Sequence, residues 1–221
     1  MKNINDILFI VQAREGSTRI SDKMTRPFNG INLFRHCLRT VKSTIIPKTQ
    51  LYASVGEQNL IKCAELEGVQ IYNRSLESAK ESSDLRLIFE WNKLDYDYYI
   101  LINACCPFIS PETINKFINS FVSSDYMGMM SVLKKKNILW DAQKNYLNKR
   151  VGEDFQTQTL PHYYEAAHCL YAGSMERLRN EGVHMGTFSE PNDPATYVIP
   201  ESEAFDIDEL WQFELAEKRF S

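Results

Sequence analysis

The chain has 221 residues, of which 43% are hydrophobic and 24% are charged, and its formal net charge is -4. These values are typical of a single folded domain over residues 1–221 and exclude a disordered chain. A weakly acidic chain has no general attraction for nucleic acid or anionic membranes, and no stretch approaches the roughly 20 apolar residues of a membrane helix. We therefore expect neither nucleic acid nor a membrane as a partner.

The first residues carry no signal-peptide pattern, because their apolar run is short and no small-residue cleavage site follows it. The cysteines are odd in number and scattered, at positions 37, 63, 105, 106 and 169. This pattern does not favour a disulfide framework. A cytoplasmic protein with reduced thiols is therefore expected.

Apolar runs typical of strands alternate with segments of helical period along the chain. Strands are expected at residues 7–12, 51–55, 69–72, 98–102, 127–133, 168–172 and 204–207. Helices are expected at residues 33–41, 60–66, 85–91, 111–121 and 174–180, and from residue 209 onward. The alternation predicts an α/β fold with a mostly parallel sheet. Residues 134–161 show no clear period, and a long segment of this kind usually has a function.

The segment after the first expected strand is rich in cations and hydroxyl groups. A parallel sheet binds ligands at the carboxyl ends of its strands, and Ala13 begins at such an end. Gly16 permits a tight turn, and Ser17 and Thr18 offer hydroxyl groups. The cations are Arg14, Arg19, Lys23 and Arg26. We interpret residues 13–26 as an exposed polyphosphate-binding loop, although neither a Walker motif nor GxGxxG is present. A solvated surface loop is the alternative.

Two carboxylates stand close together near the end of the sequence, at Asp206 and Asp208. On an extended strand they would project to one face about 7 Å apart, which suits a hard cation such as Mg²⁺. The alternative is that Asp208 caps the helix expected from Glu209. The neighbouring polyphosphate loop favours the metal site.

These segments resemble the motifs of the acylneuraminate cytidylyltransferases, the CMP-N-acylneuraminate synthetases. Residues 13–23 resemble the opening Ala-Arg-x-Gly-Ser-x-Arg-x-x-x-Lys signature, and residues 206–210 resemble the metal-binding Asp-x-Asp ending. Between these two ends, further segments resemble motifs of the same family, in the same order: residues 72–74, 100–107, 131–132, 139–140 and 156–161. The sequence departs from the family pattern at Met24, at Cys105 and Cys106, and at residues 166–168.

The resemblance implies a Rossmann-like nucleotidyltransferase fold, a three-layer sandwich, and a CTP-dependent enzyme. It implies nucleotide binding by Ala13, Arg14, Gly16, Ser17, Arg19, Lys23 and Arg74. Catalysis is expected from Arg14, Arg19, Lys23 and Asp208, with Mg²⁺ held by Asp206 and Asp208. Acceptor binding is expected from Asn103, Gln158 and His168. In that family the counterpart of residues 134–161 makes the dimer contact, so a homodimer is expected.

The expected reaction is the transfer of CMP from CTP to an acidic sugar, a sialic-acid-like 2-keto sugar acid, with release of pyrophosphate. The altered residues 166–168 leave open an acceptor that bears a phosphate or phosphonate. Two further alternatives are a glycosyltransferase that uses the aspartate pair as its metal motif and an inactive nucleotide-binding homologue. The first of these leaves the basic loop unexplained.

Overall fold

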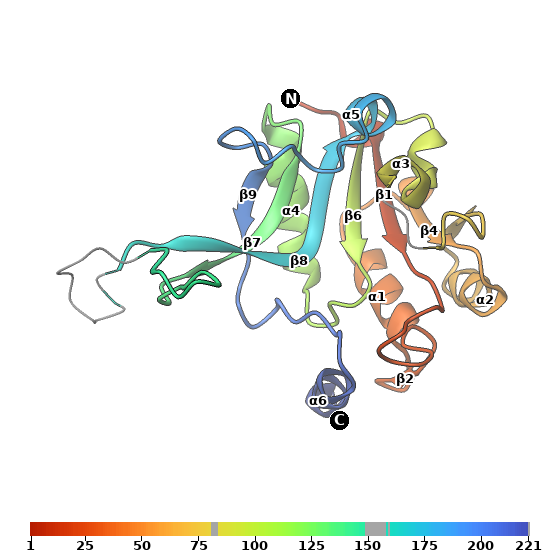
Figure 1. The fold of residues 1–221 in the computed structure, drawn as a ribbon. Helices are drawn as coiled ribbons and strands as arrows, with labels where there is room; N and C mark the ends of the chain where they lie inside the picture. Colours follow the sequence, from red (N-terminus) through yellow and green to blue (C-terminus); the bar gives the residue numbers. More distant parts are fainter. Residues whose placement is uncertain (81–83, 149–157, 159, 221) are drawn as a thin grey trace.

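The computed structural model describes residues 1–80, 84–148, 158 and 160–220. Within these residues, seven strands form one sheet in the order β5-β4-β1-β6-β8-β7-β9 (Figure 1). Their bounds are β1 Ile7–Gln12, β4 Leu51–Val55, β5 Gln70–Asn73, β6 Tyr98–Asn103, β7 Met129–Lys135, β8 Tyr163–Ser174 and β9 Ala195–Val198. A short hairpin pairs β2 (Pro27–Phe28) with β3 (Ile31–Asn32).

The α-helices are α1 Leu33–Lys42, α2 Gln58–Glu67, α3 Leu85–Ile88, α4 Pro111–Ser123, α5 Met175–Glu181 and α6 Leu210–Phe220. Short 3-10 helices lie at η1 Ile4–Asp6, η2 Lys48–Gln50 and η3 Glu90–Lys93. In the described part of the chain, no helix is both long enough and apolar enough to cross a membrane.

The sheet is mostly parallel, as predicted. Strands β5, β4, β1 and β6 run parallel to one another, and β7 is parallel to β9. Only β8, among the described strands of this sheet, is antiparallel to its neighbours β6 and β7. The apolar side chains of β1 are fully buried, which is typical of a strand covered on both faces.

Helices cover the two faces of the sheet in separate layers. Helices α1, α2, α4 and α6 pack in one core with alternate residues of β1, such as Phe9 and Val11. The other residues of β1, Leu8 and Ile10, pack with Trp91 of η3 and with α5. The predicted three-layer α/β architecture is therefore confirmed (Figure 1).

Strand β8 carries a bulge of several residues where it pairs with β7. Met130 lies opposite Tyr171, whereas Val132 lies opposite Ala166. Residues 167–170 of β8 therefore face Ser131 alone, whose Oγ accepts a hydrogen bond from the Leu170 amide at 3.0 Å. Within this bulge His168 adopts a positive φ of 56°, a conformation unusual for a residue other than glycine. Bulges of this kind reorient side chains near functional sites.

Helices α1 and α2 are joined by a buried carboxylate. Glu67, which is only 6% exposed, accepts hydrogen bonds from Arg35 Nε at 2.8 Å and from Arg39 Nε at 3.0 Å. Lys42 Nζ lies 3.6 Å from the second oxygen. Burial raises the pKa of Glu67, but the hydrogen bonds from the two arginines outweigh burial and leave the pKa below its ordinary value.

Several expected elements differ from the structure. The strand expected at residues 204–207 is wrong, because this segment crosses the end of the sheet and Ile207 N bonds only to Cys105 O, at 3.0 Å, outside any ladder. The helix expected at 85–91 breaks at Phe89, whose ψ of 53° is not helical. The last helix begins at Leu210 rather than Glu209. Strand β9 and the hairpin were not predicted, although Asn29-Gly30, both with positive φ, is a strong hairpin signal.

Candidate active site

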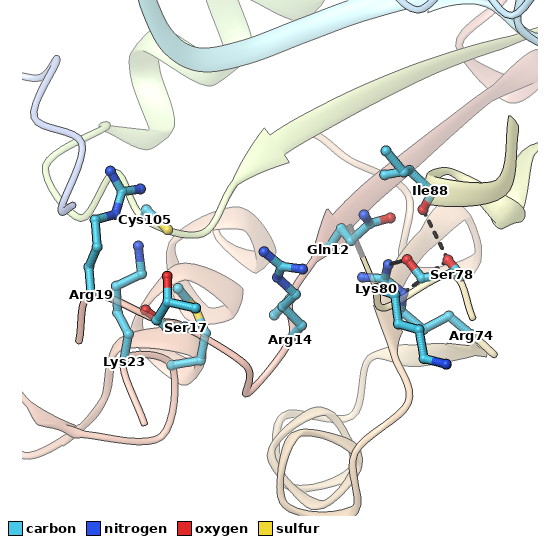
Figure 2. A pocket seen from close by; sticks show the side chains of 13 residues that line it. Gln12, Arg14, Ser17, Arg19, Lys23, Arg74, Ser78, Lys80, Ile88 and Cys105 are labelled. Atoms are coloured by element: carbon cyan, nitrogen blue, oxygen red, sulfur yellow. Dashed lines mark hydrogen bonds between the residues drawn. The ribbon is translucent and has the colours of Figure 1, made fainter. Parts of the chain in front are cut away.

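A cavity of 710 Å³ lies at the carboxyl end of β1 (Figure 2). It is lined by Gln12, Ala13, Arg14, Ser17, Thr18, Arg19, Lys23, Met24, Arg74, Ser78, Lys80, Ile88 and Cys105. Five of these side chains are cationic, and no Asp or Glu of the described residues lines the cavity. The cavity therefore suits a polyanion, in a chain whose net charge is negative.

Six of the seven expected nucleotide-binding residues meet at this cavity, namely Ala13, Arg14, Ser17, Arg19, Lys23 and Arg74. The exception is Gly16, which does not line it. A Cβ at Gly16 would meet no atom within 4 Å, and its φ lies outside the left-handed region. The geometry of this loop therefore does not require glycine at position 16. Ser17 is fixed locally, because its Oγ accepts a hydrogen bond from Ile20 N at 3.3 Å.

Lys23 is buried, and the expectation that it is an exposed loop cation is wrong. The residue is only 9% exposed, and its Nζ donates to the Ile207 carbonyl at 2.6 Å. Ile207 belongs to the segment that carries the aspartate pair, so this bond connects distant parts of the sequence. Lys23 therefore joins the cation loop to the aspartates. Arg19 is the exposed partner of this arrangement, with 56% of its side chain accessible.

The opposite side of the cavity is organised by Arg74, which is 5% exposed. Its Nε donates to Ser78 Oγ at 3.2 Å, and its Nη2 donates to the Ser78 carbonyl (Figure 2). Burial lowers the pKa of Arg74, although arginine stays charged at neutral pH. Arg14 Nη1 donates to the Ala79 carbonyl at 3.0 Å. A Cβ at Gly56 would lie 2.7 Å from the Arg74 carbonyl oxygen, so this close approach requires glycine.

Asp206 and Asp208 fit a metal site on one direct observation. Asp206 Oδ1 is buried and has no hydrogen-bond partner among the described residues. Burial and the neighbouring Asp208 carboxylate raise the pKa of Asp206. A bound cation would be coordinated by the unpartnered oxygen, and its positive charge would offset the repulsion between the two carboxylates. Within the described ranges, no group of three or more His, Cys, Asp or Glu residues could hold a metal, so phosphate oxygens and water would have to complete the ligand set.

Asp208 does not serve as the helix cap that the alternative interpretation requires. The amides of Asp208 and Glu209 both donate to Gln212 Oε1, each at 2.7 Å. The Asp208 carboxylate turns instead toward the cation loop, where Arg19 Nη2 lies 2.6 Å from Oδ1. The side chain that satisfies backbone amides at this helix start is therefore Gln212.

Two of the expected acceptor residues meet between β6 and β8. Asn103, the last residue of β6, donates from Nδ2 to the His168 carbonyl at 2.8 Å. Its Oδ1 accepts from the amide of Cys105, a cavity residue, at 2.9 Å. The bulge of β8 presents the His168 ring to Tyr171, and Nδ1 lies 2.9 Å from the Tyr171 hydroxyl. Asn103 and His168 are therefore placed next to the cation cavity.

Gln158, the third expected acceptor residue, lies apart from the other two. Its carbonyl accepts a hydrogen bond from Lys136 Nζ at 2.5 Å, which places it beside the end of β7. There β7 and β8 extend beyond the other strands as a ribbon (Figure 1). The residues on either side of it, 149–157 and 159, lie outside the described part of the chain, and so does half of the motif at 156–161.

Five cavity residues were not identified as site residues from the sequence: Gln12, Ser78, Lys80, Ile88 and Cys105. Gln12 had a signal, because it is a polar residue that ends a strand of buried apolar residues. Ser78 and Lys80 follow no motif and reach the cavity through the turn after β5. Burial raises the pKa of Cys105 to about 11, so its thiol stays neutral at physiological pH.

Two known proteins are similar to nearly the whole of this chain. N-acylneuraminate cytidylyltransferase B of Danio rerio is 23% identical over 214 residues, which cover 95% of this chain and 50% of the relative. The chain therefore spans about half the length of that relative. CMP-N,N'-diacetyllegionaminic acid synthase of Legionella pneumophila is 24% identical over 228 residues, covering 96% of this chain and 95% of the relative.

Solved structures share the fold. A CMP:2-keto-3-deoxy-manno-octonic acid synthetase complexed with CTP superposes with a TM-score of 0.68 at 12% identity, covering 96% of this chain and 97% of the other. A 4-diphosphocytidyl-2C-methyl-D-erythritol synthase from Anaerococcus prevotii gives a TM-score of 0.64 at 13% identity, covering 98% and 97%. The cytidylyltransferase family model matches residues 8–218, nearly the whole chain. This chain therefore belongs to the cytidylyltransferase family, and it is a nucleotidyltransferase.

Proposed function

We propose that this chain transfers CMP from CTP to a small acidic acceptor of the 2-keto sugar acid type and releases pyrophosphate. The observation that carries the proposal is a cavity lined by five cations, two of which, Arg19 and Lys23, lie 2.6 and 3.9 Å from the carboxylate of Asp208 at its edge. The names of the two relatives support the acceptor class, because both denote sugar acids.

The cations would bind the triphosphate and stabilise its leaving group. In the reaction an acceptor hydroxyl oxygen forms a bond to the α-phosphorus, and the bond from that phosphorus to the bridging oxygen breaks. Negative charge grows on the departing pyrophosphate, where Arg19 and Lys23 would stabilise it. Lys23 is preorganised for this role, since its stem is buried and its Nζ is held by the Ile207 carbonyl.

Asp206 and Asp208 would hold Mg²⁺, the ion that best suits two carboxylates and phosphate oxygens. When bound, the ion supplies charge neutralisation at the α-phosphate oxygens. The buried, unpartnered Asp206 Oδ1 supports this assignment. Arg19 is exposed and holds Asp208 through one ion pair, so it can exchange this carboxylate for a phosphate group.

The acceptor would lie on the Asn103 side of the cavity. Asn103 is fixed by two hydrogen bonds, and His168 by its contact with Tyr171, so neither side chain must be ordered when the acceptor binds. An imidazole and an amide can both donate to a carboxylate oxygen. These are the groups that an acidic acceptor needs.

We also propose a homodimer formed through residues 134–161, which would carry Gln158 to the acceptor site of a second copy. The described residues of this segment expose large apolar side chains, with Trp140 54%, Tyr146 52% and Leu147 62% accessible. Trp140 and Tyr146 pair across an isolated bridge with their rings 5.5 Å apart. An exposed apolar group of this kind on a projecting segment is typical of a protein interface.

The activity is tested by measuring pyrophosphate release with each nucleoside triphosphate against 2-keto sugar acids, sugar phosphates and phosphonates. We expect release with CTP and a 2-keto sugar acid, and loss of release when magnesium is chelated. Release with CTP and only a phosphonate would overturn the acceptor class and keep the nucleotide. No release with CTP and any acceptor would overturn the proposed reaction. The Gln70→Leu variant changes an exposed residue outside the cavity, so it should release pyrophosphate at the wild-type rate and serves as the control.

A further inference from the structure

Gln12 is the polar end of an otherwise apolar strand, and its side chain is held in one orientation. Its Oε1 accepts a hydrogen bond from Trp91 Nε1 at 2.8 Å. An indole N–H is a donor only, so the Gln12 atom facing it must be the amide oxygen. The amide NH₂ group must therefore point the other way.

Trp91 cannot easily turn to release Gln12. It is fully buried, and its ring packs edge-on against Tyr99 at 4.8 Å and beside Phe89 at 5.4 Å. A side chain packed in this way keeps a single rotamer. The core beneath the cavity therefore sets the direction of the Gln12 amide before any ligand binds.

The Gln12 NH₂ group is available to a ligand. Gln12 lines the cavity, and its Nε2 donates to no residue in the described ranges. Figure 2 shows Gln12 between Arg14 and Ser78, in the middle of the cavity. The cavity therefore contains a neutral hydrogen-bond donor fixed between two groups of cations.

We infer that Gln12 is a specificity-determining residue that donates a hydrogen bond to a ribose hydroxyl oxygen of the nucleotide. This inference rests on the proposed function. Arg19 and Lys23, next to the aspartate pair, mark the phosphate end of the cavity. The nucleoside then extends toward Ser78, and its ribose lies between phosphates and base. A neutral amide donor suits a hydroxyl oxygen, whereas the nearby guanidinium and ammonium groups suit phosphates.

The test measures the dissociation constants of CTP, 2'-deoxy-CTP and 3'-deoxy-CTP by calorimetry with magnesium and without acceptor. Wild-type protein should bind CTP about three- to tenfold more tightly than the analogue that lacks the contacted hydroxyl, the range that one neutral hydrogen bond supplies. Gln12→Leu should weaken CTP binding by the same factor and leave that analogue unchanged, so the preference disappears. Gln70→Leu, the same change at an exposed residue of β5, should keep the wild-type preference.

Two more variants separate the donor from its orientation. Gln12→Glu keeps an acceptor for Trp91 but has no donor for the ribose, so it should also lose the preference. Trp91→Phe removes the indole N–H and frees the Gln12 amide to rotate. The preference for CTP over the deoxy analogue should then fall, even if an unchanged unfolding temperature shows that the protein is still folded. A wild-type protein with no preference against either analogue, or a Gln12→Leu variant that keeps it, would overturn the role of Gln12 while CTP binding stands. A wild-type protein that does not bind CTP would overturn the proposed function and this inference with it.

Discussion

Arg19 Nη2 lies 2.6 Å from Asp208 Oδ1, and Lys23 Nζ lies 3.9 Å from the same oxygen. A single carboxylate oxygen of the proposed metal site is therefore already shared by two cations. A divalent ion that binds Asp208 must compete with both, unless the triphosphate draws Arg19 away. Metal and nucleotide binding should consequently be coupled, since the metal competes with Arg19 for Asp208 and the triphosphate draws Arg19 away from it.

The first prediction concerns this competition. In the absence of nucleotide, Arg19→Met should bind Mn²⁺ about two- to fivefold more tightly than wild type, because an exposed ion pair contributes only modestly. Arg26→Met removes a cation of the same loop outside the cavity lining and should leave Mn²⁺ affinity unchanged. Titration with Mn²⁺ as a spectroscopic probe makes the measurement. An Arg19→Met variant with unaltered or weaker Mn²⁺ binding would show that the ion pair does not compete with metal.

The second prediction concerns Asp208 itself. Asp208→Asn should lower the rate of pyrophosphate release on the order of a thousandfold, since a metal ligand is lost in the transition state. The free energy of unfolding should barely change, because Gln212 accepts from the amides at the start of α6. Glu209→Gln, one residue along and exposed, is the matched control and should remain active. Turnover of Asp208→Asn close to wild type would refute the metal assignment.

The third prediction separates two cations of one loop. Arg19→Ala should weaken CTP binding and change the free energy of unfolding by less than about 1 kcal/mol, because its ion pair is exposed. Lys23→Ala should weaken CTP binding and also cost about 1–3 kcal/mol, because a charged hydrogen bond to the Ile207 carbonyl is lost. Calorimetry and chemical denaturation of the two variants give these quantities. Equal stability of the two variants would contradict the anchoring role of Lys23.

The fourth prediction is a pH dependence of stability. The pKa of Glu67 is lower in the folded chain than its ordinary value, so the folded state binds this proton less readily than the unfolded state. The resulting stabilisation is present above the ordinary glutamate pKa and is lost as pH falls through the folded pKa. Glu67→Gln should therefore be less stable than wild type at pH 7, by about 1–3 kcal/mol, and the difference should shrink below about pH 4. Denaturant titrations at several pH values test this. A difference that is independent of pH would contradict it.

The fifth prediction concerns the projecting segment. The wild-type protein should be a dimer at micromolar concentration, and Trp140→Asp with Leu147→Asp should give monomers, because charges would be buried in the interface. Trp211→Asp changes a residue that is 60% exposed on α6 and should leave the dimer intact. Light scattering distinguishes these outcomes. A monomeric wild type, or a dimeric double variant, would show that residues 134–161 do not form the interface.

Local patterns in the sequence predicted the central elements well. Strands β1 and β4 have the expected bounds, and α4 begins at Pro111 after Ser110, whose Oγ accepts from Thr113 N at 3.1 Å. These features depend on apolar runs and on capping chemistry within a few residues. The short strand β9 lacked such a signal, since only Ala195 of its four residues is buried.

The site was less predictable, because it depends on contacts between distant residues. The motifs indicated Arg19, Lys23 and Asp208, but not that Lys23 is buried and donates to the Ile207 carbonyl between the aspartates. The alternation of Phe205 and Ile207 with aspartates is typical of a strand, yet this segment pairs with no described strand, and the Ile207 amide bonds to the Cys105 carbonyl in a loop. The fixed amide of Gln12 depends on Trp91, which lies 79 positions further along the chain.

The hydrogen bond from Lys23 to Ile207 has a consequence for synthesis of the chain. Ile207 follows Lys23 by 184 positions, so the ribosome makes the loop about 10 to 40 seconds before its partner emerges. Until then the Lys23 ammonium group must remain hydrated, because the carbonyl that accepts its hydrogen bond has not yet been made. The early strands can pair during translation, but the proposed CTP site is complete only after the segment that contains Ile207 has docked.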